Sequence, residues 1–434
     1  MSIRIINADV FEGLAQLEDE SVHCVVTSPP YWGLRCYGVD GQLGLEPTLG
    51  EHIETMVRVF GEVKRVLRKD GTLWLNYGDC YATSANGRSA AATKELGNDD
   101  RTFRDKPFST VGPINKGKRI ERGNGRWGGG NNPAGGVLKP KDLCMIPARL
   151  AIALQEDGWW IRSEIIWAKP NPMPESIQDR PTSSHEKIYL LSKSPRYFYD
   201  AEAVRVPAKY PDDDRIGRAS MNHKRAPTEK ISGIRPRQDK QRGHSRRHAG
   251  FNDCWDQMPR EERQSMGANL RNVWNIATKS CSEAHFATFP PALIDPCIKA
   301  GTSEKGVCPE CGAPWIREIE TTLTPTKKAA KTFIVDERDK SADRNDQGSN
   351  RQKDGHKSGH VNISKTLGWS PSCECGVPTA FPATMLDPFG GSGTTGLVAD
   401  RLGRDAILIE LNPEYCDLAR KRIADDAPLF TEVT

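Results

Sequence analysis

The sequence predicts an α/β fold with a mixed, mainly parallel β-sheet, and two segments at opposite ends of the chain support this prediction. The apolar run at residues 22–27 ends abruptly before two prolines, as a buried strand does where a loop begins. Residues 384–410 give a strand, a glycine-rich turn, a helix and a second strand that ends on Glu410. This order is typical of a nucleotide-binding βαβ unit, so a Rossmann-like sheet is expected.

The first segment continues as Ser28-Pro29-Pro30-Tyr31. Pro30 restricts the residue before it to extended geometry, so the carbonyl of Pro29 points outward in a fixed direction. A hydroxyl, a rigid carbonyl and an aromatic face then lie at the carboxyl end of a parallel strand, where open α/β sheets place their binding sites. Such a group can hold a flat base and accept hydrogen bonds from its amino group. The alternative is a proline turn beneath a core tyrosine.

The second segment predicts a cofactor site. Its glycines, Gly390, Gly391 and Gly393, let the backbone approach a ligand, and the acid that ends the second strand can bind both ribose hydroxyls. The glycine spacing differs from the G-x-G-x-x-G of dehydrogenases, and no phosphate-binding lysine follows as in a P-loop. A ligand with a ribose but no phosphate fits this pattern, which indicates S-adenosylmethionine.

Together the two motifs resemble those of the DNA amino-methyltransferases, specifically the beta class, in which the catalytic motif precedes the cofactor motif. The resemblance extends to four further segments: Gly71–Asp79, Ile165–Ser176, His185–Lys193 and His285–Pro290. It implies a Rossmann-like S-adenosylmethionine-dependent methyltransferase fold with a permuted motif order. It also implies site-specific methylation of double-stranded DNA.

The resemblance assigns the site residues. The catalytic residues would be Ser28, Pro29, Pro30 and Tyr31. The cofactor-binding residues would be Asp9, Asp387, Pro388, Phe389, Gly391, Ser392, Gly393, Thr394 and Glu410. The segment 387–394 would hold the methionine moiety, Glu410 the ribose and Asp9 the adenine amino group. For Asp9 the alternative is a cap at the end of a strand.

The expected chemistry follows from the target nitrogen. An exocyclic amino nitrogen is a poor nucleophile because its lone pair is delocalised into the ring. Acceptance of its two N–H bonds by the Ser28 hydroxyl and the Pro29 carbonyl would localise that pair, while Tyr31 stacks on the flipped base. In the family, T-S-P-P-Y after an aliphatic residue is typical of enzymes that act on N4 of cytosine, whereas D-P-P-Y is typical of adenine N6. Cytosine N4 is therefore the expected target, with adenine N6 as the alternative.

Two rival classes stay open. An RNA or protein amino-methyltransferase would share the catalytic motif, and a catalytically silent DNA-binding protein would keep the fold. The intact pairing of the proline motif with the glycine loop disfavours the silent protein. A cognate restriction endonuclease and an orphan enzyme are both compatible with the sequence, and the oligomeric state is left open.

The composition divides the chain into halves and insertions. We expect residues 1–80 and 141–200 to form the catalytic half of the methyltransferase domain. Residues 273–300 and 380–434 should form the cofactor-binding half.

Two basic segments interrupt these halves. Residues 81–140 read as a flexible, basic and glycine-rich insertion that orders on DNA, or as a plain disordered insertion. Residues 201–272 are the expected target-recognition region. Within them, residues 201–250 hold 13 Lys or Arg against 6 Asp or Glu, which suits neutralisation of phosphates. A solvated loop would have a similar composition.

Four cysteines predict a metal site within an insertion at residues 301–379. They form two close pairs, Cys308 with Cys311 and Cys373 with Cys375, and a glycine follows each pair, as in knuckle-like turns. Four thiolates suit a structural, tetrahedral zinc ion. The C-x-C spacing of the second pair and the long gap between pairs leave redox-active or unliganded cysteines as the alternative. A catalytic zinc is not expected, because no H-x-E motif lies nearby.

Bulk properties narrow the class further. The net charge is only +4, so any attraction to nucleic acid must come from local charge. The sequence shows no apolar run of membrane-spanning length and no secretory signal. The remaining cysteines stand singly, which disfavours a disulfide framework and fits a reducing cytoplasm. We therefore expect a cytoplasmic protein without membrane association.

Overall fold

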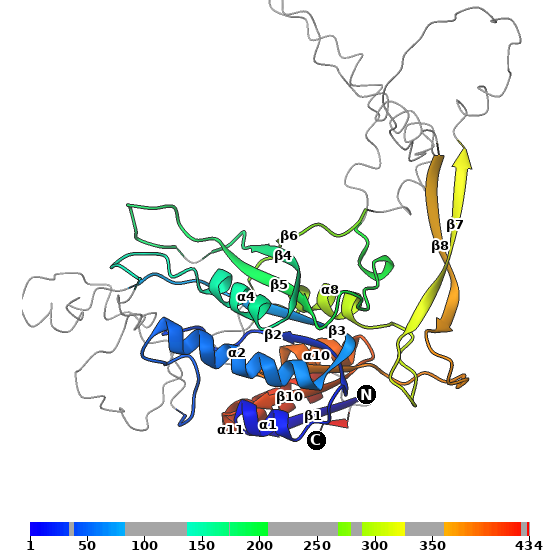
Figure 1. Ribbon diagram of the computed structural model, residues 1–434, viewed down its shortest axis with the longest axis horizontal. Helices are drawn as coiled ribbons and strands as arrows, with labels where there is room; N and C mark the ends of the chain where they lie inside the picture. Colours follow the sequence, from blue (N-terminus) through cyan, green and yellow to red (C-terminus); the bar gives the residue numbers. More distant parts are fainter. Residues whose placement is uncertain are drawn as a thin grey trace, which may run out of the picture. The chain divides into compact units, whose positions relative to one another are not determined.

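The alternating strand and helix signals of the sequence form a nine-stranded sheet in the computed structural model, in the order β11-β1-β10-β9-β2-β3-β5-β4-β6 (Figure 1). The strands are β1 Ser2–Asn7, β2 Val22–Thr27, β3 Leu67–Tyr77, β4 Trp160–Ala168, β5 His185–Ser192, β6 Val273–Asn275, β9 Thr384–Asp387, β10 Asp405–Glu410 and β11 Glu432–Val433. Neighbouring strands pair in parallel, except that β5 is antiparallel to both β3 and β4. The predicted mixed, mainly parallel sheet is confirmed.

The structure describes part of the chain: residues 1–33, 39–82, 137–172, 174–206, 268–278, 289–325, 360–426 and 432–433. Most of the predicted insertion 81–140 and of the predicted recognition region 201–272 lies outside the described residues, as does most of the segment His285–Pro290. The DNA contacts expected of these segments therefore stay predictions.

Two compact units make up the chain. The first comprises Met1–Val204, Arg271–Ile316 and Pro371–Thr434, and the second comprises Arg205–Leu270 and Arg317–Ser370. The described part of the second unit is largely a two-stranded ribbon of β7 (Trp315–Pro325) and β8 (His360–Pro371), of which Trp315, Ile316 and Pro371 are assigned to the first unit. On this ribbon the Arg317 guanidinium lies 4.3 Å from the centre of the Trp369 ring.

Helices cover both faces of the sheet in the first unit (Figure 1). They are α1 Val10–Ala15, α2 Leu49–Val66, α4 Ile146–Glu156, α8 Pro291–Gly301, α10 Thr394–Arg401 and α11 Pro413–Asp426, with a short 3₁₀ turn η3 at Glu202–Val204. On β10, Leu408 faces α10 and its neighbour Ile409 faces α1. Because successive strand residues point to opposite faces, α1 and α10 lie on opposite sides of the sheet.

The longest described helix, α2, shows how the sequence sets these elements. It begins with a capping box in which the Thr48 hydroxyl accepts a bond from the Glu51 amide and the Glu51 carboxylate accepts one from the Thr48 amide. Its apolar stripe is buried against the sheet at Met56, Phe60 and Val63. None of the helices that the structure describes has the length and apolar character needed to cross a membrane.

The chain connections place a binding edge between β2 and β9. These two strands are adjacent and parallel, but the chain leaves β9 toward β10 on one side and leaves β2 toward β3 on the other. Strand pairs of this kind leave a crevice at their carboxyl ends, where open α/β sheets bind ligands. Both motifs found in the sequence lie at this edge.

Candidate active site and cysteine cluster

The carboxyl ends of β2 and β9 are joined by the Asp387 carboxylate. It accepts hydrogen bonds from the hydroxyls of Thr27 and Thr395, each at 2.7 Å, and from the Phe389 amide at 3.1 Å. The side chain is 1% exposed, and this burial raises the pKa of Asp387 to about 6. Thr27 and Asp387 are 360 residues apart, so the two motifs meet as the sequence predicted. Through these three bonds the Asp387 carboxylate fixes the loop that follows β9.

The glycine loop after β9 is shaped by its backbone and by Glu410. Gly393 has a φ of +75°, and a Cβ there would lie 2.8 Å from the Cβ of Ala419. One Glu410 oxygen accepts the Gly391 amide and the other accepts the Asn412 amide, both at 2.8 Å. Burial raises the pKa of Glu410. Each carboxylate oxygen has further acceptor capacity for a ligand hydroxyl.

Two predicted cofactor residues turn their side chains toward α11. Arg422 donates to the hydroxyls of Ser392 at 2.8 Å and Thr394 at 2.9 Å, and to the Ser392 carbonyl at 3.0 Å. Both hydroxyl residues are buried, as is Pro388, whereas Phe389 is half-buried. Any contact of Ser392 or Thr394 with a ligand would therefore come from the backbone. Arg422 could not be predicted from the sequence, because its pairing depends on how α11 packs.

Asp9 lies at the same edge and caps α1. Its carboxylate accepts bonds from the amides of Phe11 at 2.8 Å and Glu12 at 3.0 Å. Strand β1 pairs with β10 so that Asn7 lies opposite Glu410. Asp9 and Glu410 thus lie at the same end of the neighbouring strands β1 and β10. The alternative for Asp9 was a cap at the end of a strand, and in the structure Asp9 caps the helix that follows β1.

The Ser28-Pro29-Pro30-Tyr31 loop carries a chain of hydroxyl groups. The Ser28 hydroxyl donates to the Tyr31 hydroxyl at 3.2 Å, which donates in turn to the Glu186 carboxylate at 2.9 Å. The Tyr31 ring stacks on Tyr77 with centroids 4.8 Å apart. Burial raises the pKa of Tyr31 well above its usual value. Among the described residues, none donates a hydrogen bond to the carbonyl of Pro29.

Three polar residues that the sequence analysis missed surround Tyr31. Asn76 donates to both the Tyr31 hydroxyl and the Glu186 carboxylate, each at 3.0 Å, and Lys169 forms an ion pair with Glu186. Asn76 is 5% exposed, and its amide oxygen has no partner among the described residues. Two signals could have found this group: a polar residue inside the apolar strand β3, and a charge at the start of the apolar strand β5.

The four predicted cysteines form one cluster in the first unit. Their sulfur atoms all lie within 4.8 Å of one another. Gly312 and Gly376, which follow the pairs, have φ of +67° and +74°, as tight knuckle turns require. The amides of Cys311 and Glu310 lower the pKa of Cys308 to about 7, whereas the neighbouring thiols raise that of Cys375. Sulfur atoms around zinc lie roughly 3.8 Å apart, given Zn–S bonds of about 2.3 Å, so the donor set fits this ion.

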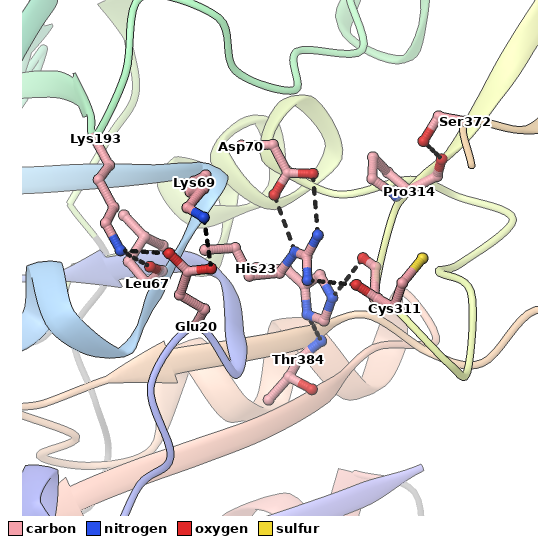
Figure 2. Close-up of polar contacts among 12 residues, drawn as sticks. Glu20, His23, Leu67, Lys69, Asp70, Lys193, Cys311, Pro314, Ser372 and Thr384 are labelled. Carbon is pink, nitrogen blue, oxygen red and sulfur yellow. Dashed lines mark hydrogen bonds and ion pairs between the residues drawn. The ribbon is translucent and has the colours of Figure 1, made fainter. Parts of the chain in front are cut away.

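Figure 2 shows how the first knuckle is attached to the sheet. His23 of β2 accepts the Thr384 amide at Nδ1, at 3.0 Å, and contacts the Gly312 carbonyl through Nε2 at 3.1 Å. Burial lowers the pKa of His23 to about 4, so the ring is neutral with its proton on Nε2. Arg68 donates to the Cys311 carbonyl at 2.8 Å. The cluster is thus fixed to the amino ends of β2 and β9, away from the loop at Ser28.

Comparisons with known proteins agree with this arrangement. A profile of the DNA methylase family matches residues 22–309 and 382–421. The type II methyltransferase M.Cfr9I of Citrobacter freundii is 34% identical over 97% of this chain and 89% of its own length. The type II methyltransferase M.SmaI of Serratia marcescens is 32% identical over 97% of this chain and 91% of its own length.

Solved structures show weaker similarity. The cytosine-N4-specific PvuII DNA methyltransferase aligns over 98% of this chain and 92% of its own, with 14% identity and a TM-score of 0.45. A putative DNA modification methylase of Thermus thermophilus, complexed with S-adenosyl-L-methionine, aligns over 100% and 99%, with 18% identity and a TM-score of 0.42. The match to the family profile and the relatives that align over most of their length are the stronger findings. They show that this chain belongs to the N6/N4 DNA methylase family of DNA amino-methyltransferases.

Proposed function

We propose that this chain transfers a methyl group from S-adenosylmethionine to N4 of a cytosine flipped out of double-stranded DNA. The observation that carries the proposal is the position of the Ser28 hydroxyl and the Pro29 carbonyl beside the Asp387 loop, at the carboxyl ends of adjacent parallel strands. A serine in this loop, preceded by Val26 and Thr27, favours cytosine over adenine. Adenine N6 is the alternative that the product analysis below decides.

The residues of the chain suit this reaction. The Ser28 hydroxyl and the Pro29 carbonyl accept the two N–H bonds of the amino group, which localises the nitrogen lone pair. The face of Tyr31 away from Tyr77 stacks on the flipped base, which offsets the few kcal/mol lost on unstacking. Pro29, Pro30 and the Tyr77 ring hold these groups in place, so that the nitrogen and the methyl carbon can approach within about 3 to 3.5 Å.

The loop after β9 fits the proposed cofactor. S-adenosylmethionine supplies an electrophilic methyl group on a positively charged sulfur. The carboxylates of Asp387 and Glu410 lie in a buried environment that raises both pKa values, and a nearby positive charge would favour their ionised forms. The Glu410 oxygens can each accept one ribose hydroxyl besides their amide bonds. Asp9 is proposed to bind the adenine amino group through the carboxylate that caps α1.

The names of the relatives support a setting in restriction and modification. M.Cfr9I and M.SmaI are type II methyltransferases, which we take as support for modification of one defined DNA site by this chain as well. Residues 201–272 are proposed to recognise that site, with the basic insertion 81–140 as a further DNA contact. A restriction endonuclease of the same specificity is a proposed partner.

The product decides the proposal. Purified protein is incubated with double-stranded DNA and S-adenosylmethionine, the DNA is digested to nucleosides, and these are separated and identified by mass. We expect N4-methylcytosine. N6-methyladenine alone would overturn the choice of cytosine, and methylation of RNA or protein in place of DNA would overturn the substrate class. Single-molecule sequencing of the same DNA then gives the modified site.

We also propose that Cys308, Cys311, Cys373 and Cys375 hold one structural zinc ion. The four sulfurs already lie within 4.8 Å of one another, and the knuckle amides stabilise a thiolate at Cys308. The ion would fix the base of the β7–β8 ribbon, since the two cysteine pairs flank that ribbon in the chain. Metal analysis of protein purified without added zinc should find about one equivalent. The paired variant Cys308→Ser, Cys311→Ser should contain none.

A further inference from the structure

The Glu186 carboxylate is the centre of the polar group behind Tyr31. It lies at the start of β5, its side chain is 18% exposed, and Lys169 forms an ion pair with one of its oxygens. The other oxygen accepts the Tyr31 hydroxyl at 2.9 Å and the Asn76 amide at 3.0 Å. Lys169 also lies 4.4 Å from the centre of the Trp167 ring, which holds the ammonium group in place. All three of these neighbours are hydrogen-bond donors, so the carboxylate acts as an acceptor in each contact.

A carboxylate that accepts in all its contacts fixes the direction of every hydrogen bond in the chain that leads to Ser28. Because Glu186 can only accept, the single proton of the Tyr31 hydroxyl is used in the bond to Glu186. The contact of 3.2 Å between Ser28 and Tyr31 must then be donated by Ser28. With its proton directed inward, the Ser28 hydroxyl presents only lone pairs to a ligand.

The orientation of Asn76 gives independent support. Its amide nitrogen donates to both Tyr31 and Glu186, and its buried oxygen has no partner among the described residues. Rotation of the amide would satisfy neither acceptor and would place the oxygen against the Glu186 carboxylate. The accepting carboxylate thus orients Asn76 as well as Tyr31, even though the buried Asn76 oxygen is left without a partner among the described residues.

We propose that Glu186, held by Lys169, is a positioning residue that acts through Tyr31 to make the Ser28 hydroxyl an obligate acceptor. A base that presents an amino group can donate to this hydroxyl, whereas a base that presents a carbonyl at the same place meets only lone pairs. The site therefore selects amino-bearing bases over keto-bearing bases before any chemistry. This inference rests on the proposed function, because it concerns how the same loop recognises its target.

The test compares binding of amino and keto bases. Two duplexes carry the mapped modification site, one with the natural target base and one with its keto analogue, which is uracil for cytosine or hypoxanthine for adenine. Both have an abasic site opposite the target position, so that the cost of unpairing is the same in the two duplexes. Their Kd values are measured with S-adenosylhomocysteine present, so the readout does not depend on turnover. We expect the wild-type protein to favour the amino base by about tenfold, and Glu186→Gln and Tyr31→Phe to reduce this preference several-fold.

Kinetics of the same variants separate a positioning role from a structural one. Both substitutions should lower kcat by on the order of 10- to 100-fold with little change in the Kd for S-adenosylmethionine. The double variant should be no worse than the single variants, because the residues act in one chain. The matched control is Glu164→Gln, which breaks the ion pair with Lys187 on the same two strands but does not contact Tyr31. It should keep the wild-type preference and kcat.

The outcomes are distinct. A wild-type amino preference in folded Glu186→Gln, or additive losses in the double variant, would overturn the inference. If Glu186→Gln does not fold, Tyr31→Phe decides, because it keeps the ring that stacks on Tyr77 and removes only the hydroxyl. The absence of any methylated nucleoside from the wild-type protein would instead overturn the proposed function.

Discussion

Strands β2 and β9 are joined by hydrogen bonds at both ends of the pair. The two ends differ in which hydrogen-bonding groups are left without a partner. At the amino ends, the Thr384 amide donates to His23, and the His23 ring in turn contacts the Gly312 carbonyl. At the carboxyl ends, the Thr27 hydroxyl donates to Asp387. At the carboxyl end, the Pro29 carbonyl and the Asn76 oxygen have no partners among the described residues, whereas beside the cysteine cluster the buried Trp315 Nε1 has none. The groups left unused are thus hydrogen-bond acceptors at the carboxyl end and a donor beside the cluster, and acceptors are what an amino group requires.

The largest expected difference comes from a serine at each end of β2. Ser28→Ala removes the proposed acceptor and should lower kcat by on the order of 10²- to 10³-fold, with cofactor affinity unchanged. Its matched control is Ser21→Ala, at the other end of the strand, where the hydroxyl donates to the Glu18 carbonyl at 2.7 Å. That variant should keep its kcat in tritium-transfer assays with saturating DNA. Equal losses of kcat in Ser28→Ala and Ser21→Ala would contradict the proposal that only the carboxyl end of β2 takes part in the reaction.

Substitutions at two glycines test how closely the Tyr31 ring is packed at the carboxyl end. A Cβ on Gly78 would lie 2.6 Å from the Tyr31 ring, so Gly78→Ala should displace the ring and lower kcat by up to about 10²-fold. Gly61, in the middle of α2, has no heavy atom within 4 Å of the same position. Gly61→Ala should leave kcat unchanged and raise stability by about 0.5–1 kcal/mol. Steady-state kinetics and thermal melts of both variants measure the two effects, and an active Gly78→Ala would contradict the assigned position of Tyr31.

Changes at the amino ends of β2 and β9 should lower the stability of the protein without lowering kcat. The variant Cys308→Ser, Cys311→Ser, or removal of metal by a chelator, should lower Tm by roughly 5 to 10 °C because the knuckle no longer fixes its insertion. At a temperature well below the new Tm, kcat should stay within about twofold of the wild type. Ser372→Ala is the matched control, because it removes a hydrogen bond of 2.6 Å to the Pro314 carbonyl beside the cluster but leaves all four cysteines in place. A large fall in kcat without a fall in Tm would place the cluster in the reaction.

The last expected effect concerns stability alone and is a pH dependence at Asp387. Burial raises its pKa from 3.8 to about 6, so between these values the folded state holds a proton that the unfolded state has lost. The contribution of Asp387 to the free energy of unfolding should therefore fall as the pH rises from about 4 to about 6, and stay level above that. Urea unfolding of the wild type and Asp387→Asn from pH 4 to 7 measures this difference. A difference that grows with pH would show that the pKa is lowered instead.

Much of this arrangement could be predicted from the sequence, because strand ends in a parallel sheet share an edge. The proline motif and the glycine loop were expected to meet, and the bond between Thr27 and Asp387 confirms it. The cysteine pairs were expected to converge, and their sulfurs do. The roles assigned to individual site residues remain predictions.

The partners of individual side chains could not be predicted. Arg422 binds Ser392 and Thr394 because α11 packs against the loop, a contact that no local pattern records. Glu186 meets Tyr31 because β5 runs antiparallel beside β3, and Lys169 meets Glu186 because β4 pairs with β5. Side-chain pairing depends on the register and direction of strands that are distant in sequence, whereas motif position depends only on strand ends.

The distance along the chain between Thr27 and Asp387 has a consequence for synthesis of the protein. The strand that presents the catalytic loop is made first, and its partner β9 follows 360 residues later. At about 5–20 residues per second, roughly 20 to 70 seconds separate the two during translation. A chain still on the ribosome has the loop for a base but no strand to complete the cofactor edge. Methylation is therefore expected only after β9 has been made, and fragments that lack β9 should be inactive.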